Sequence, residues 1–244
     1  DMLGCDFIAT GHYAQVREEN GRYVVSKGID ESKDQSYVLW GLSQSCLKRT
    51  IFPMGKYHKK DIKQMALDRG YVELANKSES YEICFIPDND YRSFLKRRVD
   101  GLEEKVKGGK FITKTGEVVG THDGYPFYTI GQRKLGVSLG KDPTYVIGIN
   151  PDDNTVVIGK KDDLKELEMT VRNINFVKYD SIPDGLQSTT KVRYKHNGEE
   201  SVLSNEDGEI KVLFHKKVEG IAPGQSAVFY EGDDVLGGGF IKRK

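Results

Sequence analysis

Short apolar runs separated by glycine and other turn residues fill most of the second half of the chain, and this pattern restricts the fold more than any other feature of the sequence. Beyond about residue 170, apolar and polar residues alternate with period two. Short runs bounded by turns are typical of β-strands. We therefore expect an all-β second half that ends in a small closed barrel. Before residue 160 the expected strands lie at 111–112, 117–119, 127–130, 145–147 and 155–158.

The first part of the chain has a different pattern, in which strands and helices alternate. An apolar run over 6–10 predicts a buried strand that leads into a loop. Two further runs, 13–16 and 22–26, flank Asn20-Gly21, a dipeptide that readily takes the positive φ angles of a hairpin turn. Amphipathic spacing over 58–69 predicts a helix. This alternation indicates an α/β fold.

Two changes of pattern divide the chain into three predicted domains. A basic helical segment at 91–98 precedes the glycine-punctuated strands, and a second change lies between 164 and 170. We expect an α/β domain over 1–92, a small β-rich central domain over 93–166 and a β-barrel over 167–244. The predicted fold class is therefore α/β plus all-β.

The charge balance bears on the class of partner. The 37 Lys and Arg residues are matched by 37 Asp and Glu residues, which excludes a polybasic arm as the main feature. Basic and aromatic residues are nevertheless interleaved at 91–98, 128–134 and 191–196. Such mixtures suit RNA, because cations meet phosphates and aromatic rings stack on bases, although a solvated surface is the alternative. No apolar run approaches the roughly 18 residues of a membrane-spanning helix, so we expect no membrane partner.

The three cysteines, Cys5, Cys46 and Cys84, are far apart and form no C-x-x-C pair. They therefore indicate neither a disulfide framework nor a structural zinc site, and a reducing, cytoplasmic location fits best. Apolar neighbours predict that Cys5 and Cys46 lie in the core. Two interpretations stay open for Cys84, which is either a small core residue or a partly exposed thiolate that acts as nucleophile or sulfur carrier.

Gly11 and His12 follow the first predicted strand. A glycine there lets the backbone approach a ligand closely, and α/β proteins bind nucleotides at the carboxyl ends of parallel strands; a simple turn glycine is the alternative. A histidine side chain ordinarily changes charge near neutral pH, which suits a general base or phosphate partner at position 12; a residue that only caps the loop is the alternative. The sequence contains no Walker-type phosphate loop, no dinucleotide-binding glycine motif and no metal-binding motif, and we expect no metal ligands from the protein.

Five stretches, in order along the chain, resemble the bacterial tRNA-specific 2-thiouridylases. They are ATGHYAQV, SKDQSYVLWGL, SESYEICFIPDNDYRSFL, THDGYPFYTIGQRKLGV, and APGQSAVFY with VLGGGFI. The resemblance implies the C-terminal part of a PP-loop (Rossmann-like) adenine-nucleotide domain, a small central domain and a tRNA-binding β-barrel. The family's Ser-Gly-Gly-Val-Asp-Ser phosphate loop and its upstream catalytic cysteine have no counterpart here. We therefore expect a fragment that is incomplete for catalysis.

The activity implied by the resemblance is ATP-dependent transfer of sulfur to C2 of the wobble uridine in the tRNAs for Lys, Glu and Gln. ATP, with Mg²⁺, would adenylate the C2 oxygen, and a cysteine persulfide would then deliver the sulfur. Cys84 matches the family's persulfide-bearing cysteine, and a persulfide donor protein is the expected partner. The family's second cysteine, which can form a disulfide with the carrier, has no match, because neither Cys5 nor Cys46 stands in its motif.

The resemblance also assigns binding residues one by one. Gly11 matches a nucleotide-contacting glycine, and His12 matches a position at the tRNA interface. The other tRNA-binding assignments are Lys33, Asp34, Gln35, Arg193, Tyr194 and Gln225, with Arg133 and Lys134 as further RNA candidates. The chemistry agrees, since Arg193 offers a planar fork for phosphate and Tyr194 a stacking face.

Two alternatives remain open at this point. The chain is a non-catalytic RNA-binding module formed by its two β-rich domains, or it belongs to another PP-loop enzyme, such as an amide-forming synthetase, that releases pyrophosphate without sulfur transfer. Cys84→Ser separates these alternatives from a thiolation enzyme, because only sulfur transfer requires the thiol.

Overall fold

The computed structural model describes residues 4–77, 85–86 and 88–243. The chain forms two compact units. The first combines residues 1–77 with 167–218 and 223–244, and the second comprises 78–166 and 219–222. The N-terminal segment and the C-terminal strands therefore share one unit, although the central segment separates them in the sequence.

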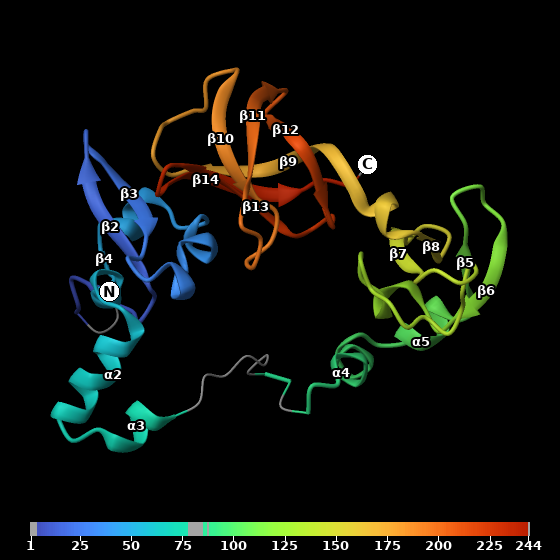
Figure 1. Cartoon of the computed structure of the whole chain (residues 1–244), viewed down its shortest axis with the longest axis horizontal. Helices are drawn as coiled ribbons and strands as arrows, with labels where there is room; N and C mark the ends of the chain where they lie inside the picture. The colour runs from blue at the N-terminus through green and yellow to red at the C-terminus, as the bar shows by residue number, and fades with distance from the viewer. Residues whose placement is uncertain (1–3, 78–84, 87, 244) are drawn as a thin grey trace. The chain divides into compact units, whose positions relative to one another are not determined.

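Six strands of the first unit close into a barrel (Figure 1). Their order is β13-β10-β11-β12-β9-β14, and β14 pairs again with β13 to complete the ring. This confirms the predicted barrel. The strands are β9 (Lys165–Phe176), β10 (Leu186–Lys191), β11 (Glu199–Glu206), β12 (Glu209–Glu219), β13 (Ser226–Glu231) and β14 (Asp234–Ile241).

The barrel interior holds apolar side chains and a small group of buried hydroxyls. Leu203 pairs with Val212 across β11 and β12, and both side chains are fully buried. Ser188, Thr190 and Ser201 lie on the same inner face and bond to one another at 2.7–3.1 Å. These hydroxyls satisfy each other, so their burial leaves no polar group without a partner.

The N-terminal segment adds a hairpin, helices and a short second sheet to the first unit. The hairpin strands β2 (Ala14–Glu19) and β3 (Arg22–Lys27) are joined by Asn20 and Gly21, whose φ angles of 51° and 76° confirm the predicted turn. β3 extends the barrel sheet by pairing Ser26 with Asp234 of β14. The other elements are β1 (Ile8–Ala9), η1 (Glu31–Lys33), η2 (Ser36–Leu39), α1 (Gln44–Leu47), β4 (Thr50–Ile51), η3 (Pro53–Lys56), α2 (Lys59–Asp68) and α3 (Val72–Asn76).

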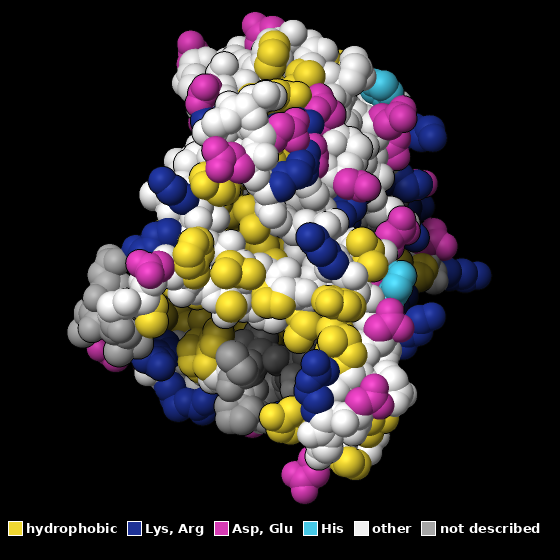
Figure 2. Space-filling model, turned by 90° about the vertical axis from the view of Figure 1, so that its left-hand side faces the viewer, with side chains coloured by type: hydrophobic (Ala, Val, Ile, Leu, Met, Phe, Trp, Pro, Cys, Tyr) yellow, Lys and Arg dark blue, Asp and Glu magenta, His cyan; other side chains and the backbone are white. Residues whose placement is uncertain are grey.

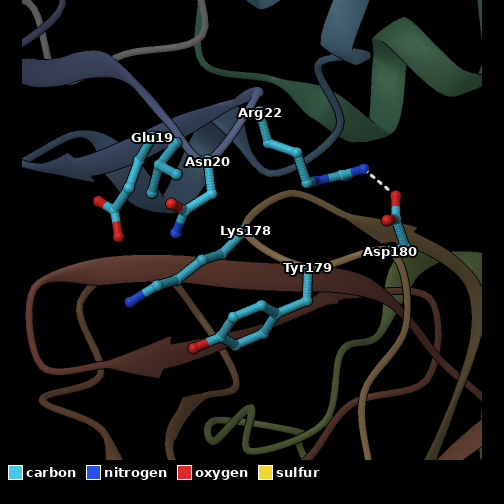
Figure 3. Close-up of a pocket in the computed structure, with 7 residues that line it drawn as sticks. Glu19, Asn20, Arg22, Lys178, Tyr179 and Asp180 are labelled. Atoms are coloured by element: carbon cyan, nitrogen blue, oxygen red, sulfur yellow. Dashed lines mark hydrogen bonds and ion pairs between the residues drawn. The ribbon is translucent and has the colours of Figure 1, made fainter.

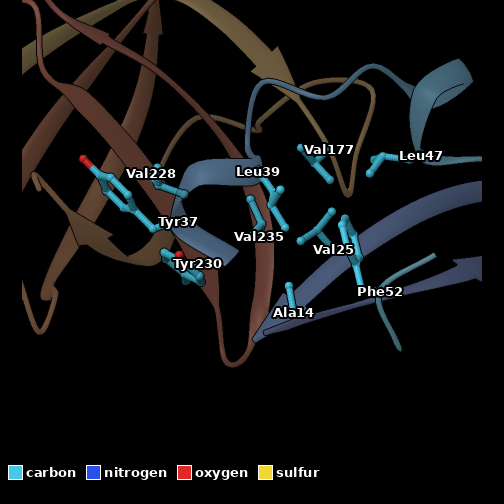
Figure 4. Close-up of a cluster of buried hydrophobic side chains, with 10 residues drawn as sticks. All are labelled: Ala14, Val25, Tyr37, Leu39, Leu47, Phe52, Val177, Val228, Tyr230 and Val235. Carbon is cyan, nitrogen blue, oxygen red and sulfur yellow. The ribbon is translucent and has the colours of Figure 1, made fainter. Parts of the chain in front are cut away.

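An apolar cluster joins this segment to the outer face of the barrel (Figure 4). Along β13, Ala227 and Phe229 point into the barrel, so the alternating Val228 and Tyr230 point outward. The outward side chains are buried beneath residues of the hairpin, η2 and α1. The cluster consists of Ala14, Val25, Tyr37, Leu39, Leu47, Phe52, Val177, Val228, Tyr230 and Val235.

An ionic network lies beside this cluster. Asp234 accepts from Arg17 and Lys178 at 2.8 Å each, and from Ser26 at 2.6 Å. Although burial opposes ionisation, these three donors hold the pKa of Asp234 far below its usual range. An adjoining cavity has a volume of about 140 Å³. Figure 3 shows that two of its lining residues, Arg22 of the hairpin and Asp180 of the loop after β9, form an ion pair. This ion pair links the hairpin to the rest of the first unit.

The glycines of β14 allow this close packing. A Cβ atom on Gly238 would lie 2.9 Å from Cγ of Trp40 and 2.7 Å from the carbonyl oxygen of Ala227. Trp40 follows η2, so the barrel strand and the N-terminal segment meet at a position where only glycine fits.

The second unit contains a four-stranded sheet in the order β6-β5-β8-β7. β5 and β8 are parallel, and the other neighbours are antiparallel. Its core consists of Phe111, Val146, Val156 and Ile158. The elements are α4 (Tyr91–Arg98), α5 (Leu102–Val106), β5 (Gly109–Ile112), β6 (Val118–His122), η4 (Tyr125–Phe127), β7 (Tyr145–Asn150), β8 (Thr155–Gly159) and η5 (Lys161–Leu164).

The expected strand at 127–130 is wrong. The residues form the end of η4 and a loop, because Pro126 lies in the first turn of the 3₁₀ helix and the Phe127 carbonyl accepts from Tyr91 Oη at 2.7 Å instead of from a neighbouring strand. Arg92 of α4 also lies over the rings of Phe127 and Tyr128, at 5.7 and 5.6 Å.

Two burial predictions are also wrong. The strand expected over 6–10 is only the two-residue β1, which pairs in parallel with β4, and Ile8 is 63% exposed. Cys5 and Cys46 are exposed rather than core residues, because both residues of the nearby β1 are themselves exposed and Leu47 is the residue that α1 buries. Cys84 lies outside the described residues.

Apolar side chains remain exposed on the surface that Figure 2 shows. In the N-terminal segment the exposed ones include Phe7, Ile8, Ile51 and Leu74. Within the part of the chain that the structure describes, no helix has both the length and the apolar character needed to cross a membrane.

We expect Gly238→Ala to lower the free energy of unfolding by about 1–3 kcal/mol, because the new methyl group has no room beside Trp40 and Ala227. Urea unfolding measures the change. Gly41→Ala is the matched control, since a Cβ there meets no atom within 4 Å. Equal stability of the two variants would contradict the packing argument.

Candidate functional site

Two loops that are far apart in the sequence meet at one side of the first unit. The loop between β3 and η2 contains Lys33, Asp34 and Gln35, and the loop after β10 contains Arg193 and Tyr194. Tyr194 Oη donates a hydrogen bond to the backbone carbonyl of Asp34 at 3.1 Å, across 160 residues of sequence. The structure therefore brings together two groups of candidates that were assigned separately.

The carboxylate of Asp34 is used within its own loop. Oδ1 accepts from the backbone N–H groups of Gly28 and Ser36 at 3.2 and 3.1 Å, and Oδ2 accepts from Ser36 Oγ at 2.9 Å. Ser36 is fully buried, and its hydroxyl also lies 3.1 Å from Tyr230 Oη in the barrel. Asp34 thus fixes the loop and connects it to the barrel through Ser36.

Gln35 joins the same loop to the start of β2. Its backbone N–H donates to the Tyr13 carbonyl at 2.9 Å, and its Oε1 accepts from the Tyr13 N–H at 3.1 Å. The candidates Gly11 and His12 lie directly before Tyr13. These two hydrogen bonds therefore hold the loop of Gln35 beside the segment of Gly11, His12 and Tyr13.

Gly11 and His12 form an open corner after β1. Gly11 is exposed, and a Cβ added there would meet no atom within 4 Å. His12 is half-buried, with Nδ1 2.9 Å from Thr10 Oγ1 and its ring edge-on to Phe52. A flat ligand therefore has room to approach the backbone at Gly11.

Tyr37 links the loops to the candidate Gln225. Its hydroxyl donates to the carbonyl of Ser226 at 2.7 Å, and its ring lies 6.1 Å from that of Tyr194. The preceding residue, Gln225, is exposed, and its backbone carbonyl accepts from the Ile241 N–H at 2.8 Å. Burial raises the pKa of Tyr37 to about 12, with a smaller opposing effect from the charge of Arg193. Tyr37 stands in the stretch SKDQSYVLWGL but was not assigned as a site residue, because its partner lies 189 residues away in the sequence.

The candidates thus form one surface, which we call the loop surface: Gly11, His12, Lys33, Asp34, Gln35, Arg193, Tyr194 and Gln225. Arg193, Tyr194 and Gln225 are exposed, whereas Lys33, Asp34 and Gln35 are half-buried. Arg133 and Lys134 belong to the second unit, where the Arg133 guanidinium lies 6.0 Å from the Tyr145 ring centroid. Among residues 4–77, 85–86 and 88–243, no group of three or more His, Cys, Asp or Glu side chains is placed to hold a metal ion.

Three family models match the chain in sequence order. They describe a tRNA methyl transferase HUP domain over residues 1–88, a tRNA methyl transferase PRC-barrel domain over 92–160 and an aminomethyltransferase beta-barrel domain over 166–241. The HUP domain is Rossmann-like, so these matches confirm the predicted fold class of an α/β part, a β-rich central part and a C-terminal barrel.

Curated relatives match almost the whole chain. The tRNA-specific 2-thiouridylase MnmA of Cytophaga hutchinsonii is 58% identical over 245 residues, which cover 99% of this chain and 66% of the relative. The protein of the same name from Salinibacter ruber is 51% identical and is covered to 64%. The tRNA-specific 2-thiouridylase MnmA 2 of Clostridium botulinum is 44% identical and is covered to 67%. The chain spans just under two thirds of the length of the first two relatives.

We expect Asp34→Ala to lower the free energy of unfolding by about 1–3 kcal/mol, because the buried N–H groups of Gly28 and Ser36 lose their acceptor. Thermal or urea unfolding measures this loss. Glu31→Ala is the matched control, since it removes an exposed carboxylate from the same loop. A loss no greater than that of the control would refute the loop-fixing role.

We expect the stability to fall as the pH rises from about 10 to 12, partly because of Tyr37. An unfolded tyrosine titrates near pH 10, whereas burial raises the pKa of Tyr37 to about 12. The folded state therefore holds this proton more tightly, and the stability that it contributes below pH 10 is lost through that window. Urea midpoints measured across the window are expected to fall less steeply in Tyr37→Phe, but not in a variant of the exposed Tyr71. Parallel curves for wild type and Tyr37→Phe would contradict the assignment.

Proposed function

Because the chain belongs to the family of tRNA-specific 2-thiouridylases, we propose that it takes part in ATP-dependent sulfur transfer to tRNA. The acceptor is C2 of the wobble uridine in the tRNAs for Lys, Glu and Gln, and the setting is the cytoplasm. The observation that carries this proposal is the loop surface, where segments from both ends of the chain are hydrogen-bonded into one face.

Two kinds of residue have different roles in the proposed tRNA contact. Asp34 and Gln35 position the surface, because their side-chain oxygens are engaged by their own loop and by Tyr13. Arg193 supplies a guanidinium for phosphate, and Tyr194, which is 43% exposed, supplies a ring for stacking on a base. Lys33, His12 and Gln225 complete the contact with charge and hydrogen-bonding groups.

The nucleotide is proposed to lie beside Gly11. The open space at this residue fits the close approach of an adenine or ribose to the backbone after a strand. The described residues include no cluster of metal ligands, so Mg²⁺ would be held mainly by the nucleotide phosphates. ATP supplies the adenylyl group that turns the C2 oxygen into a leaving group.

Cys84 is proposed as the persulfide carrier. The terminal sulfur of its persulfide would form the new bond to C2, and the bond from C2 to the adenylated oxygen would break to release AMP. A second thiol then takes up the remaining Cys84 sulfur as a disulfide, which balances the electrons of persulfide cleavage. A persulfide donor protein reloads the thiol. Neither Cys5 nor Cys46 is assigned as the second thiol.

The three parts of the chain divide this work in the proposal. Residues 1–92 contribute the nucleotide corner and the Cys84 segment, 93–166 form the central domain, and 167–244 form the tRNA-binding barrel.

A sulfur-labelling experiment tests the function. The chain is given ATP, unmodified tRNA and a persulfide donor that carries labelled sulfur, and the label is followed in the Cys84 peptide and in the uridine. We expect Cys84→Ser to abolish labelling while tRNA binding is unchanged, because the thiol alone accepts sulfur. Cys46→Ser, which alters another exposed cysteine, is the matched control and is expected to behave as wild type.

Sulfur transfer that survives in Cys84→Ser would refute the carrier role. Release of pyrophosphate without any labelled sulfur would indicate a different PP-loop enzyme. Binding of RNA with no labelling and no nucleotide dependence would indicate a non-catalytic RNA-binding module.

A further inference from the structure

Lys191 lies at the edge of the loop surface and is the first residue of the basic stretch 191–196, but it is not among the residues assigned individually to tRNA binding. It is the last residue of β10, two positions before Arg193. Its strand partner is Val228, whose side chain faces outward in the apolar cluster, so Lys191 lies on the same outer face of the barrel. Its Nζ is 5.5 Å from the ring centroid of Tyr230.

A second lysine contacts the same ring. Lys27 Nζ lies 5.4 Å from the Tyr230 centroid, and it donates to the Gly232 carbonyl at 3.2 Å and to Asp233 Oδ1 at 3.1 Å. The charge of Lys27 is therefore matched by a carboxylate. Tyr230 is itself fixed, because it is buried and its hydroxyl meets Ser36.

The ammonium group of Lys191, unlike that of Lys27, forms no ion pair with a carboxylate of the described residues. Within the described part of the chain it forms no hydrogen bond and no ion pair, and the ring contact with Tyr230 is its only direct partner. Asp34 is the carboxylate that attracts it, but the two oxygens of Asp34 already accept three hydrogen bonds from Gly28 and Ser36. Burial, aided by the charge of Lys27, lowers the pKa of Lys191 against the pull of Asp34.

A half-buried cation without a counter-ion is unfavourable in the free protein, and an incoming anion removes that cost. The cation–π contact with Tyr230 restricts where the ammonium lies, so the position is prepared in advance. The neighbouring Arg193 and the exposed ring of Tyr194 extend the same face. A chain of phosphates with unstacked bases matches this combination better than a small anion does.

We propose that Lys191 is a binding site for a backbone phosphate of the tRNA, beside the contacts of Arg193 and Tyr194. This assignment rests on the proposed function and adds a residue to its RNA contact. Lys191 acts as a point charge, so its contribution is independent of base sequence.

The experiment measures tRNA binding by the full chain as a function of salt concentration. Lys191→Met is expected to weaken binding and to make the slope of log K against log[salt] shallower by about one, because one phosphate contact is lost. Lys191→Arg keeps the charge and is expected to retain the wild-type slope. The matched control is Lys217→Met, an exposed lysine on β12, the strand opposite β13 in the ring.

Amine acetylation gives a second readout that does not depend on a variant. In the free chain both Lys191 and Lys217 are expected to react, and added tRNA is expected to protect Lys191 alone. Inorganic phosphate at the same phosphate concentration is expected to give no protection, because it lacks the neighbouring contacts.

The outcomes separate the two proposals. If wild type binds tRNA but Lys191→Met keeps its slope, or Lys191 is acetylated equally with and without tRNA, the Lys191 assignment is overturned and the proposed function stands. Equal protection by inorganic phosphate would overturn the assignment to RNA in favour of a free-anion site. If wild type does not bind tRNA at any salt concentration, the proposed function fails and this assignment fails with it.

Discussion

Burial of the N-terminal segment against the outer face of β13 and β14 is the contact on which the rest of the first unit depends. Tyr37 and Leu39 of η2 pack on Val228 and Val235 of the barrel, and each fully buried side chain of this kind contributes roughly 1.5–3 kcal/mol. The packing requires Gly238, where the barrel backbone approaches Trp40. Because this packing fixes η2 against the barrel, the loop before η2 and the loop after β10 meet in a defined geometry.

Local chemistry accounts for the elements that were predicted correctly. Asn20 and Gly21 define the hairpin through their own φ angles. The helix over 91–98 begins after Asp90, whose carboxylate accepts from the Ser93 N–H as an N-cap. The residue that starts the helix therefore lies directly beside it in the sequence. The residues of 127–130 have strand-like composition, but a contact from Tyr91 determines their conformation. Such a tertiary contact overrides local preference.

In the candidate site, too, the sequence predicted some features, whereas others depend on tertiary contacts. The resemblance assigned Asp34, Gln35 and Tyr194 to one predicted function. It did not reveal that the Asp34 carboxylate accepts from its own loop, or that Tyr194 donates to the Asp34 carbonyl. Tyr37 and Lys191 lie in stretches that the sequence singled out, but they were not assigned individually as site residues, because their contacts depend on Ser226 and Tyr230, partners that only the folded barrel supplies. The exposure of Cys5 and Cys46 was missed for a related reason, since apolar neighbours in sequence do not bury a residue unless the element they lie on packs inward.

The arrangement of polar groups is compatible with the RNA-binding face proposed for this neutral chain. Carboxylates near the loop surface are consumed internally: Asp34 by backbone donors, Asp233 by Lys27, and Asp234 by Arg17 and Lys178. These contacts stabilise the loops and the hairpin, although the side chain of Asp233 remains 79% exposed. Arg193, Lys191 and Tyr194 lie beside them, so cationic and aromatic groups gather here although the formal net charge is zero. Since the loops are already hydrogen-bonded, the proposed binding of RNA would require little ordering of the protein, which favours affinity.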